Sequence, residues 1–418
     1  MNRFPIRASL ASARPIATHA ALLVLVAMPL APAPSPALAQ DGGAAPDDAR
    51  AADAYPRFPR GEFPLTDHER ASVSFDEIRS GGPPRDGIPA IDAPRFVTSE
   101  AAGEWLAPRE PVIVLERDGE AKAYPLQILI FHEIVNDTIG ELPVAVTFCP
   151  LCNASIVFER RVDGRTLDFG TTGRLRNSDL VMYDRQSESW WQQFTGRGII
   201  GRYDGTRLTS VPSRIAAAEE FAAAFPDGRV LSRETGHRRP YGQNPYRGYD
   251  SIDNSPFLYD GELDPRLPPM ARVLALDDVG GSRLVPLSLL EREPLLHLEA
   301  NGERVLVSGL GRSASALDTA RIADGRDVPA AAAWRAAVDG RELAFELDDE
   351  GRLVDVETGS RWDGFGRAID GELAGAALEQ VDRGVHFAFA WLAFEPGAAV
   401  EGAEADGAAG AGADDGEG

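Results

Sequence analysis

The chain of 418 residues contains only two cysteines, Cys149 and Cys152, and one lysine, Lys122. Two thiols exclude an iron–sulfur cluster held by four cysteines and an all-cysteine zinc site within one chain. Lysine and arginine together number 42 against 65 aspartates and glutamates, so the formal net charge is −23. This charge repels phosphate backbones and anionic lipid headgroups, and we therefore expect no nucleic acid and no membrane surface as a partner.

Apolar runs of membrane-spanning length are also missing. The apolar run from Ala20 to Leu30 is too short to cross a bilayer, and it follows three arginines in the first fourteen residues. With the small residues Ala37-Leu38-Ala39 after it, this stretch has the pattern of a secretory signal peptide over residues 1–39. We expect cleavage near Ala39 and a periplasmic or secreted protein without a membrane anchor, in a compartment where thiols tend to oxidise.

The body of the chain repeats itself at an offset of 161 residues, which becomes longer after an inserted segment near Val328 to Val338. Pro125-Leu126 recurs as Pro286-Leu287, and Trp191 is matched further on by Trp362. Such self-similarity predicts two copies of one unit. The predicted organisation is a signal peptide (1–39), a flexible linker (40–74), a first repeat (75–235), an aromatic inter-repeat loop (236–266), a second repeat without cysteine (267–400) and a disordered acidic tail (401–418).

Short apolar or alternating runs bounded by Asp-Gly, Pro or Gly predict that strands dominate. The strands expected in the first repeat include residues 112–115, 144–148, 156–162 and 181–183. Helices are expected over residues 126–135, 215–224, 330–338 and 386–394, the last with a pattern that also fits a strand. The fold class is therefore α+β and β-rich, with few helices and two pseudo-symmetric repeats of one unit.

The repeat separates scaffold residues from candidates for chemistry. Residues that both copies share, such as Trp191 and Trp362, are expected to serve folding. Residues that only one copy has are candidates for function. The candidates of this kind are Cys149, Cys152, His132 and Glu133, whose counterparts are Leu310, Ser313, Glu293 and Pro294.

Several motifs carry a resemblance to a known family. They are Gly81 to Pro89, Ala123 to Leu126, His132 to Asp137, Phe148-Cys149-Pro150-Leu151-Cys152, Asn177 to Asp184 and Gln193 to Gly196. Over about residues 75–400 the chain resembles the uncharacterised bacterial family called domain of unknown function 3179. One departure is Met270, where the family pattern has lysine after paired prolines. The resemblance implies the domain and brings no established reaction, so function has to be inferred from the site.

The Cys149-Pro150-Leu151-Cys152 motif lies between two predicted strands. It is therefore expected on a turn, and not at the N-terminus of a helix as in thioredoxin-like oxidoreductases. One interpretation is thiol redox chemistry, with Cys149 as the attacking thiol, Cys152 as the resolving thiol, His132 as base or electrostatic activator and Glu133 as a further catalytic candidate. Whether the protein is an enzyme, such as a thiol-disulfide oxidoreductase, stays open.

Two other interpretations of the motif remain. In one, Cys149, Cys152 and His132 bind copper or zinc, with Glu133 or Asn136 as a further ligand or an outer partner. In the other, the cysteines form a structural disulfide in a non-catalytic module that binds a ligand or a protein. A ring this short would stabilise the fold by only about 2 kcal/mol, which counts against a disulfide kept for stability alone.

Polar loops supply further candidate ligand-binding residues. Arg174 and Arg176 lie on a Gly-rich turn with Asn177 and Asp179, and two guanidinium groups could clamp a carboxylate or phosphate. The alternative is a solvated loop with local ion pairs. Tyr246 lies in a Pro-, Gly- and Tyr-rich segment that fits either a lid or a sealed domain junction. The partner expected from these features is a small molecule, a metal or a periplasmic protein.

Overall fold

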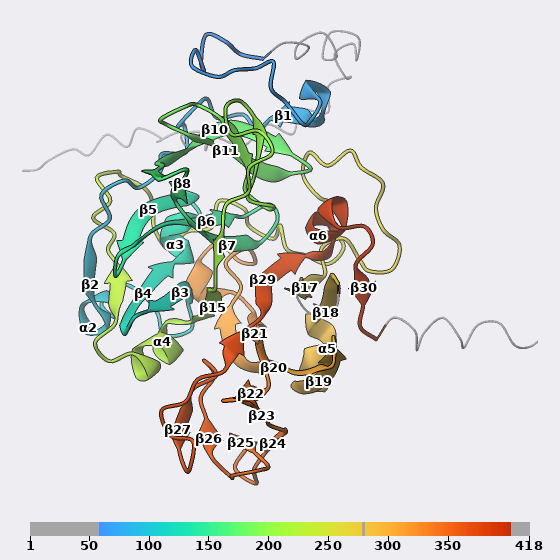
Figure 1. The fold of residues 1–418 in the computed structure, drawn as a ribbon. Helices are drawn as coiled ribbons and strands as arrows, with labels where there is room; N and C mark the ends of the chain where they lie inside the picture. The colour runs from blue at the N-terminus through green and yellow to red at the C-terminus, as the bar shows by residue number, and fades with distance from the viewer. Residues whose placement is uncertain (1–57, 278–280, 403–418) are drawn as a thin grey trace, which may run out of the picture. The chain divides into compact units, whose positions relative to one another are not determined.

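A computed structural model describes residues 58–277 and 281–402 (Figure 1). The predicted signal peptide, residues 40–57 of the predicted linker and residues 403–418 of the predicted tail lie outside the described residues. Within the described ranges, no helix is both long and apolar enough to cross a membrane. Strands dominate these ranges and the helices are short, which confirms the predicted β-rich fold class.

Residues 75–235 form three sheets and a small hairpin. The first sheet has the order β15-β3-β4-β16-β2 and the second the order β14-β7-β6-β5, while the third is β1-β10-β11-β12-β13. The strands are β1 (Ile78–Ser80), β2 (Phe96–Thr98), β3 (Pro111–Arg117), β4 (Glu120–Pro125), β5 (Ile134–Ile139), β6 (Leu142–Cys149), β7 (Ala154–Glu159), β8 (Arg161–Val162), β9 (Arg165–Thr166), β10 (Phe169–Arg176), β11 (Asp179–Asp184), β12 (Trp190–Gln192), β13 (Arg197–Ile200), β14 (Ser210–Val211), β15 (Arg214–Ala217) and β16 (Arg229–Leu231). The helices are the 3₁₀ turn η1 (Phe75–Glu77), α2 (Ser99–Ala102), α3 (Leu126–Leu129) and α4 (Ala218–Ala224).

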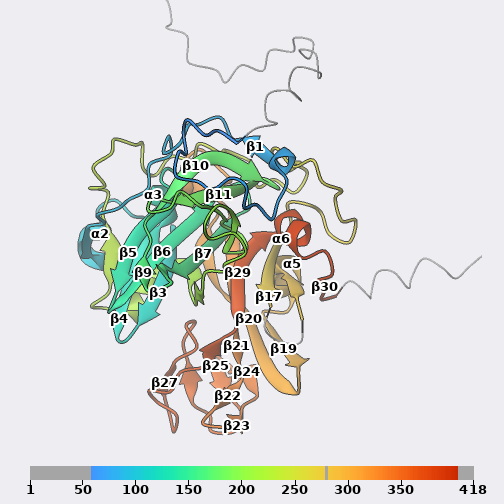
Figure 2. The same ribbon diagram turned by 45° about the horizontal axis from the view of Figure 1, so that its top comes forward.

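Residues 267–400 form sheets with the orders β29-β17-β18-β30, β19-β20-β21-β28 and β24-β25-β26-β27, and the hairpin β22-β23. The strands are β17 (Arg272–Leu276), β18 (Arg283–Pro286), β19 (Leu295–Ala300), β20 (Glu303–Ala314), β21 (Asp327–Arg335), β22 (Ala337–Val338), β23 (Arg341–Glu342), β24 (Phe345–Leu347), β25 (Leu353–Asp355), β26 (Arg361–Trp362), β27 (Ala368–Asp370), β28 (Glu379–Gln380), β29 (Asp382–Phe387) and β30 (Ala399–Val400). The helices are α5 (Leu287–Arg292), the 3₁₀ turn η2 (Ile322–Asp324) and α6 (Ala388–Phe394). In both ribbon views β29 runs between β7 and the strands β17 and β18 (Figure 2).

Residues that the predicted repeat pairs with one another have similar local structure in the two halves of the chain. Trp191 Nε1 donates to a carboxylate oxygen of Asp184 at 3.0 Å, and Trp362 Nε1 donates to Asp355 at the same distance. These buried hydrogen bonds explain why both tryptophans belong to the scaffold. That the two segments are copies of one unit stays a prediction.

Two expected helices differ from the structure. Residues 330–338 belong mainly to strand β21, because Ala330 to Trp334 are all buried and pair with β20. Alanine favours helices, but burial of a strand on both faces outweighs that preference. The helix expected over residues 126–135 ends at Leu129, and β5 begins at Ile134. Helices α4 and α6 each follow a short strand within the ranges expected to be helical.

The largest cluster of buried apolar side chains draws on both halves of the chain. It contains Phe148, Cys149 and Cys152 from the first half together with Phe387 and Trp391 from the second. The cysteine motif is therefore built into a core that the two halves share. Some of its neighbours, such as Phe387, come from more than two hundred residues away in the sequence.

The packed chain begins before residue 75. Phe63, in the part of the predicted linker that the structure describes, is 1% exposed. It packs edge-on against Trp190 and Tyr183, and Phe58 joins the same cluster. Aromatic side chains bury a large apolar area, so these two residues fix residues 58–63 against the sheet that carries β11 and β12.

Candidate functional site

The Cys149–Cys152 motif forms the turn between strands β6 and β7, as predicted. Cys149 pairs with Ala154 at the last position of the antiparallel ladder. Asn153 closes the turn with φ at 49° and donates its N–H to the carbonyl oxygen of Pro150 at 3.2 Å. Asparagine tolerates this left-handed conformation better than other residues with a side chain. The turn therefore points both thiols inward from one strand end.

The thiols meet the carboxylate of Asp179. Cys149 and Cys152 are free cysteines, 1% and 0% exposed. Their Sγ atoms and an oxygen of Asp179 all lie within 4.8 Å of one another, and Asp179 is fully buried. Asp179 reaches this place because the hairpin between β10 and β11 turns through Asn177 and Ser178, both with positive φ, which matches the natural twist of a two-residue hairpin.

The two oxygens of the Asp179 carboxylate have different surroundings. Oδ2 accepts hydrogen bonds from Gln192 Nε2 at 2.6 Å and from the backbone N–H of Phe194 at 2.9 Å. Oδ1 is buried, and no hydrogen-bond partner reaches it among the described residues. One oxygen thus fixes the orientation of the carboxylate while the other is left free beside the thiols.

Burial keeps protons on these groups near neutral pH. It raises the pKa of Asp179 to about 7, in spite of the hydrogen bonds from Gln192 and Phe194 that favour the carboxylate. Burial also raises the pKa of Glu133 to about 8, and the nearby charge of Asp179 adds to that increase. The pKa values of both thiols are raised for the same reason, with the negative charge of Asp179 contributing. The site is therefore a cluster of buried acids.

Glu133 joins this cluster from the turn between α3 and β5. Its φ is 57°, and its backbone N–H donates to the carbonyl oxygen of Leu129 at 2.7 Å. Its carbonyl oxygen accepts from Phe148 N at 2.8 Å, one residue before Cys149. The left-handed conformation of Glu133 is incompatible with a helix that continues to residue 135. The neighbouring side chains of His132 and Glu133 have different surroundings, since His132 bonds Pro89 and Tyr241 whereas Glu133 is close to the charge of Asp179.

His132 lies outside the group of thiols and carboxylate. Its Nδ1 lies 2.7 Å from the carbonyl oxygen of Pro89, and Nε2 lies 2.7 Å from the Tyr241 hydroxyl. Burial lowers the pKa of His132 to about 4, so the ring is neutral and donates through Nδ1 while Nε2 accepts from Tyr241. Both nitrogens are thereby occupied, and the structure places Asp179 instead of His132 with the two cysteines.

The family model described as "Protein of unknown function (DUF3179)" matches residues 85–398. The chain belongs to the DUF3179 family. No curated protein and no solved structure was found to match it. The matched range contains the whole thiol site, so the cluster of acids is a feature of the DUF3179 domain and not of an added segment.

The two arginines predicted to clamp a ligand form ion pairs with Glu62 and Glu77, which precede the range matched by the family model. Arg174 donates to the carbonyl oxygen of Thr172 at 2.7 Å and pairs with Glu62 at 2.9 Å. Arg176 pairs with Glu77 at 2.6 Å and lies 3.4 Å from the Gln192 side-chain oxygen. These ion pairs join residues far apart in the sequence, and Arg174 is buried, so they are not the local pairs of a solvated loop. Ligand binding by the two arginines stays a prediction. Asn177 serves the hairpin turn.

Two tyrosines of the inter-repeat segment complete the site in the DUF3179 domain. Tyr249 Oη donates to the carbonyl oxygen of Leu151, inside the cysteine motif, at 3.1 Å. Burial raises the pKa of Tyr246, and the charges of Glu133 and Cys149 add to that increase. That Tyr246 binds a ligand stays a prediction.

Sequence reasoning missed Gln192 and Tyr249. Gln192 could have been found by comparing the two predicted repeats, because its counterpart beside Trp362 is Asp363 and residues that only one copy has are candidates for function. The contact of Tyr249 with residue 151 depends on chain packing, and no local pattern predicts it.

Proposed function

We propose that this protein binds a soft transition metal ion, with Zn(II) as the ion that fits best. The ligands are the thiolates of Cys149 and Cys152 and the Oδ1 atom of Asp179. The observation that carries the proposal is the cluster of three buried ligand atoms, two sulfurs and a carboxylate oxygen of Asp179, within 4.8 Å of one another. Within the described part of the chain, no nitrogen or oxygen donor bonds Asp179 Oδ1.

The electrostatics of the cluster support a cation. The charges of Asp179 and Glu133 both raise the pKa of the Cys149 thiol, so the negative groups oppose one another's ionisation. A divalent cation would compensate these charges and displace the protons that burial retains. The hydrogen bonds from Gln192 and Phe194 would then act as the outer partners that hold a metal-bound carboxylate in place.

The mixed ligand set favours zinc over copper. Zn(II) accepts thiolate, imidazole and carboxylate ligands and takes four of them in a tetrahedron, so two sulfurs and one oxygen leave a fourth position. Glu133 lies outside this group of ligand atoms, but its charge is coupled to that of Asp179, and it would serve as an outer partner of a water in that position. Cu(I) prefers sulfur ligands and would make little use of Asp179, so dependence on Asp179 distinguishes the two metals.

Thiol redox chemistry has less support from this geometry. Exchange with another disulfide requires a thiolate and access for the partner. Here the pKa values of both thiols are raised by burial, and neither thiol is more than 1% exposed.

The proposed location of the protein is the periplasm or the exterior of the cell. This proposal rests on the sequence pattern of residues 1–39 alone.

Elemental analysis of the mature protein, purified from the periplasm, tests the proposal. We expect about one zinc per chain, lost in Cys149→Ser, in Cys152→Ser and in Asp179→Asn. Asp184→Asn is the matched control, because Asp184 is a second fully buried aspartate on β11 whose carboxylate bonds Trp191 and Ser187. It should keep the metal.

Two results would count against a zinc site. The first is copper that Asp179→Asn retains. The second is a metal-free protein whose Cys149–Cys152 pair oxidises and is readily reduced while folded, which would favour the redox interpretation.

A further inference from the structure

The thiol site is covered by a segment that contains no regular helix or strand. We call residues 241–254 the tyrosine segment. Its Tyr249 hydroxyl donates to the carbonyl oxygen of Leu151 and accepts from the backbone N–H of Phe257, both at 3.1 Å. The Tyr249 ring also meets the Phe387 ring edge-on at 6.0 Å. Tyr249 thus packs directly against the turn that carries the two buried thiols.

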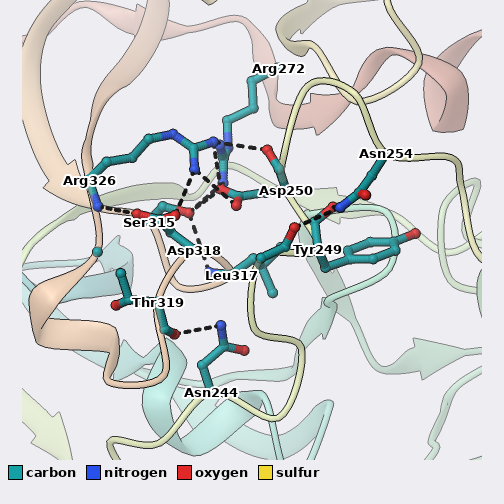
Figure 3. Close-up of polar contacts among 12 residues, drawn as sticks. Asn244, Tyr249, Asp250, Asn254, Arg272, Ser315, Leu317, Asp318, Thr319 and Arg326 are labelled. Carbon is teal, nitrogen blue, oxygen red and sulfur yellow. Dashed lines mark hydrogen bonds and ion pairs between the residues drawn. The ribbon is translucent and has the colours of Figure 1, made fainter. Parts of the chain in front are cut away.

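Asp250, the neighbour of Tyr249, anchors the tyrosine segment to the second half of the chain (Figure 3). Its Oδ2 lies 2.8 Å from Arg272 Nη2 and accepts from the Ser315 hydroxyl at 2.5 Å. Arg326 adds bonds of 3.0 Å to Oδ1 and to the backbone oxygen of Asp250. The side chains of Asp250 and Arg272 are 0% and 9% exposed, so this ion pair is largely out of water, whereas Arg326 is partly exposed.

Backbone contacts fix the same segment to the same part of the second half. Gly248 N donates to the carbonyl oxygen of Asp318 at 2.6 Å, and Ile322 N donates to that of Gly242 at 3.0 Å. Asn244 bonds Thr319 and Ala320 on the loop between them, and Figure 3 shows its amide facing Thr319. The tyrosine segment is thus attached to residues 315–326 at several points between Gly242 and Asp250.

Arg272 links the anchor to the cysteine turn. Its guanidinium carbon lies 5.5 Å from the centre of the Phe387 ring. Phe387 N in turn donates to the carbonyl oxygen of Cys152 at 3.0 Å. Contacts therefore link Asp250 through Arg272 and Phe387 to the cysteine turn, and Tyr249 contacts both Phe387 and that turn.

We propose that the tyrosine segment is a gate over the thiol site, and that the pairing of Asp250 with Arg272 and Arg326 sets its closed position. Asp250 is a positioning residue, because it acts through Tyr249 and contacts neither thiol. This gives the half without cysteine a function: it controls access to a site that the first half supplies. A role of the gate in the entry and exit of a metal ion rests on the proposed function. A role in access to the thiols does not.

Thiol labelling of the reduced, metal-free full-length mature protein tests the gate directly. Because Cys149 and Cys152 are the only cysteines, reaction with an aromatic disulfide reagent reports on this site alone. We expect Asp250→Asn to react at least about tenfold faster than the wild type, since a buried pair that loses one charge is strongly destabilised. Arg326→Gln removes one arm of the anchor, is less buried and should give a smaller increase in the same direction. Arg352→Gln, which removes an exposed ion pair beside β25, is the control and should react at the wild-type rate.

Labelling at several urea concentrations separates gate opening from global unfolding. Opening of a short segment exposes little surface, so the faster rate of Asp250→Asn should depend weakly on urea below the unfolding transition. If Asp250→Asn fails to fold, Arg326→Gln gives the answer. Labelling of folded Asp250→Asn at the wild-type rate would overturn the gate and leave the proposed metal site intact. Where Asp250→Asn does not fold, a wild-type rate in Arg326→Gln has the same meaning. Faster labelling that tracks global unfolding would overturn the gate as well. Faster labelling in a protein that binds no zinc would support the gate and count against the proposed function.

Discussion

The backbone N–H of Phe387 donates to the carbonyl oxygen of Cys152 at 3.0 Å. Two residues earlier on β29, the carbonyl oxygen of Val385 accepts from the side-chain amide of Asn153 at 3.1 Å. The turn that carries both thiols is therefore held by a strand from the other half of the chain. The two cysteines are close together in the sequence, but the residues that hydrogen-bond their turn lie more than two hundred positions away.

His132→Ala should leave the zinc content unchanged. Both ring nitrogens of His132 are occupied by Pro89 and Tyr241, so no lone pair is free for a metal. The loss of two buried hydrogen bonds should lower the free energy of unfolding by about 2 kcal/mol. Elemental analysis and urea denaturation measure the two effects. Loss of zinc from a folded His132→Ala protein would restore histidine to the ligand set.

Gln192→Ala should weaken zinc binding without removing a ligand. Gln192 Nε2 is 2.6 Å from Asp179 Oδ2, and loss of such an outer partner typically costs about 10- to 100-fold in metal affinity. Gln193→Ala is the matched control, because Gln193 is equally buried but bonds Thr147 and Ala154. Competition with a chromophoric chelator gives both affinities, and equal losses in the two variants would argue against a role of Gln192 at the metal.

The metal-free protein should lose stability as pH rises from about 4 to about 8. The folded-state pKa of Asp179 is about 7 and that of Glu133 about 8, both above their ordinary values of 3.8 and 4.5. The folded state thus holds protons that the unfolded state releases, and each such group lowers the free energy of unfolding by about 1.4 kcal/mol per pH unit within its window. Asp179→Asn should show a flatter dependence, measured by urea denaturation at each pH. Identical pH profiles would show that Asp179 is ionised in the fold.

Particular residues show which parts of the fold and of the site can be predicted from the sequence. Strands β6 and β11 and the turn between β6 and β7 follow from alternation and turn residues, which are local signals. The position of Asp179 beside the thiols is set by packing of the β10–β11 hairpin against the end of β6. No spacing along the chain encodes that contact, so the sequence pointed to His132. Residues 330–338 show the same limit, because alanine gives a helical signal that burial in a sheet overrides.

Zinc binding should release protons, and their number should fall as pH rises. At pH 6 the thiols carry their protons, because burial raises their pKa values, and Asp179 with a pKa of about 7 is mostly protonated as well. A zinc ion bound to all three groups should therefore release roughly three protons at pH 6 and roughly two at pH 8.5. Calorimetric titration in buffers of different ionisation enthalpy measures this number at each pH. Asp179→Asn, if it retains residual binding, should release about one proton fewer than the wild type at pH 6. A proton count that does not change with pH in the wild type would mean that Asp179 is not a ligand.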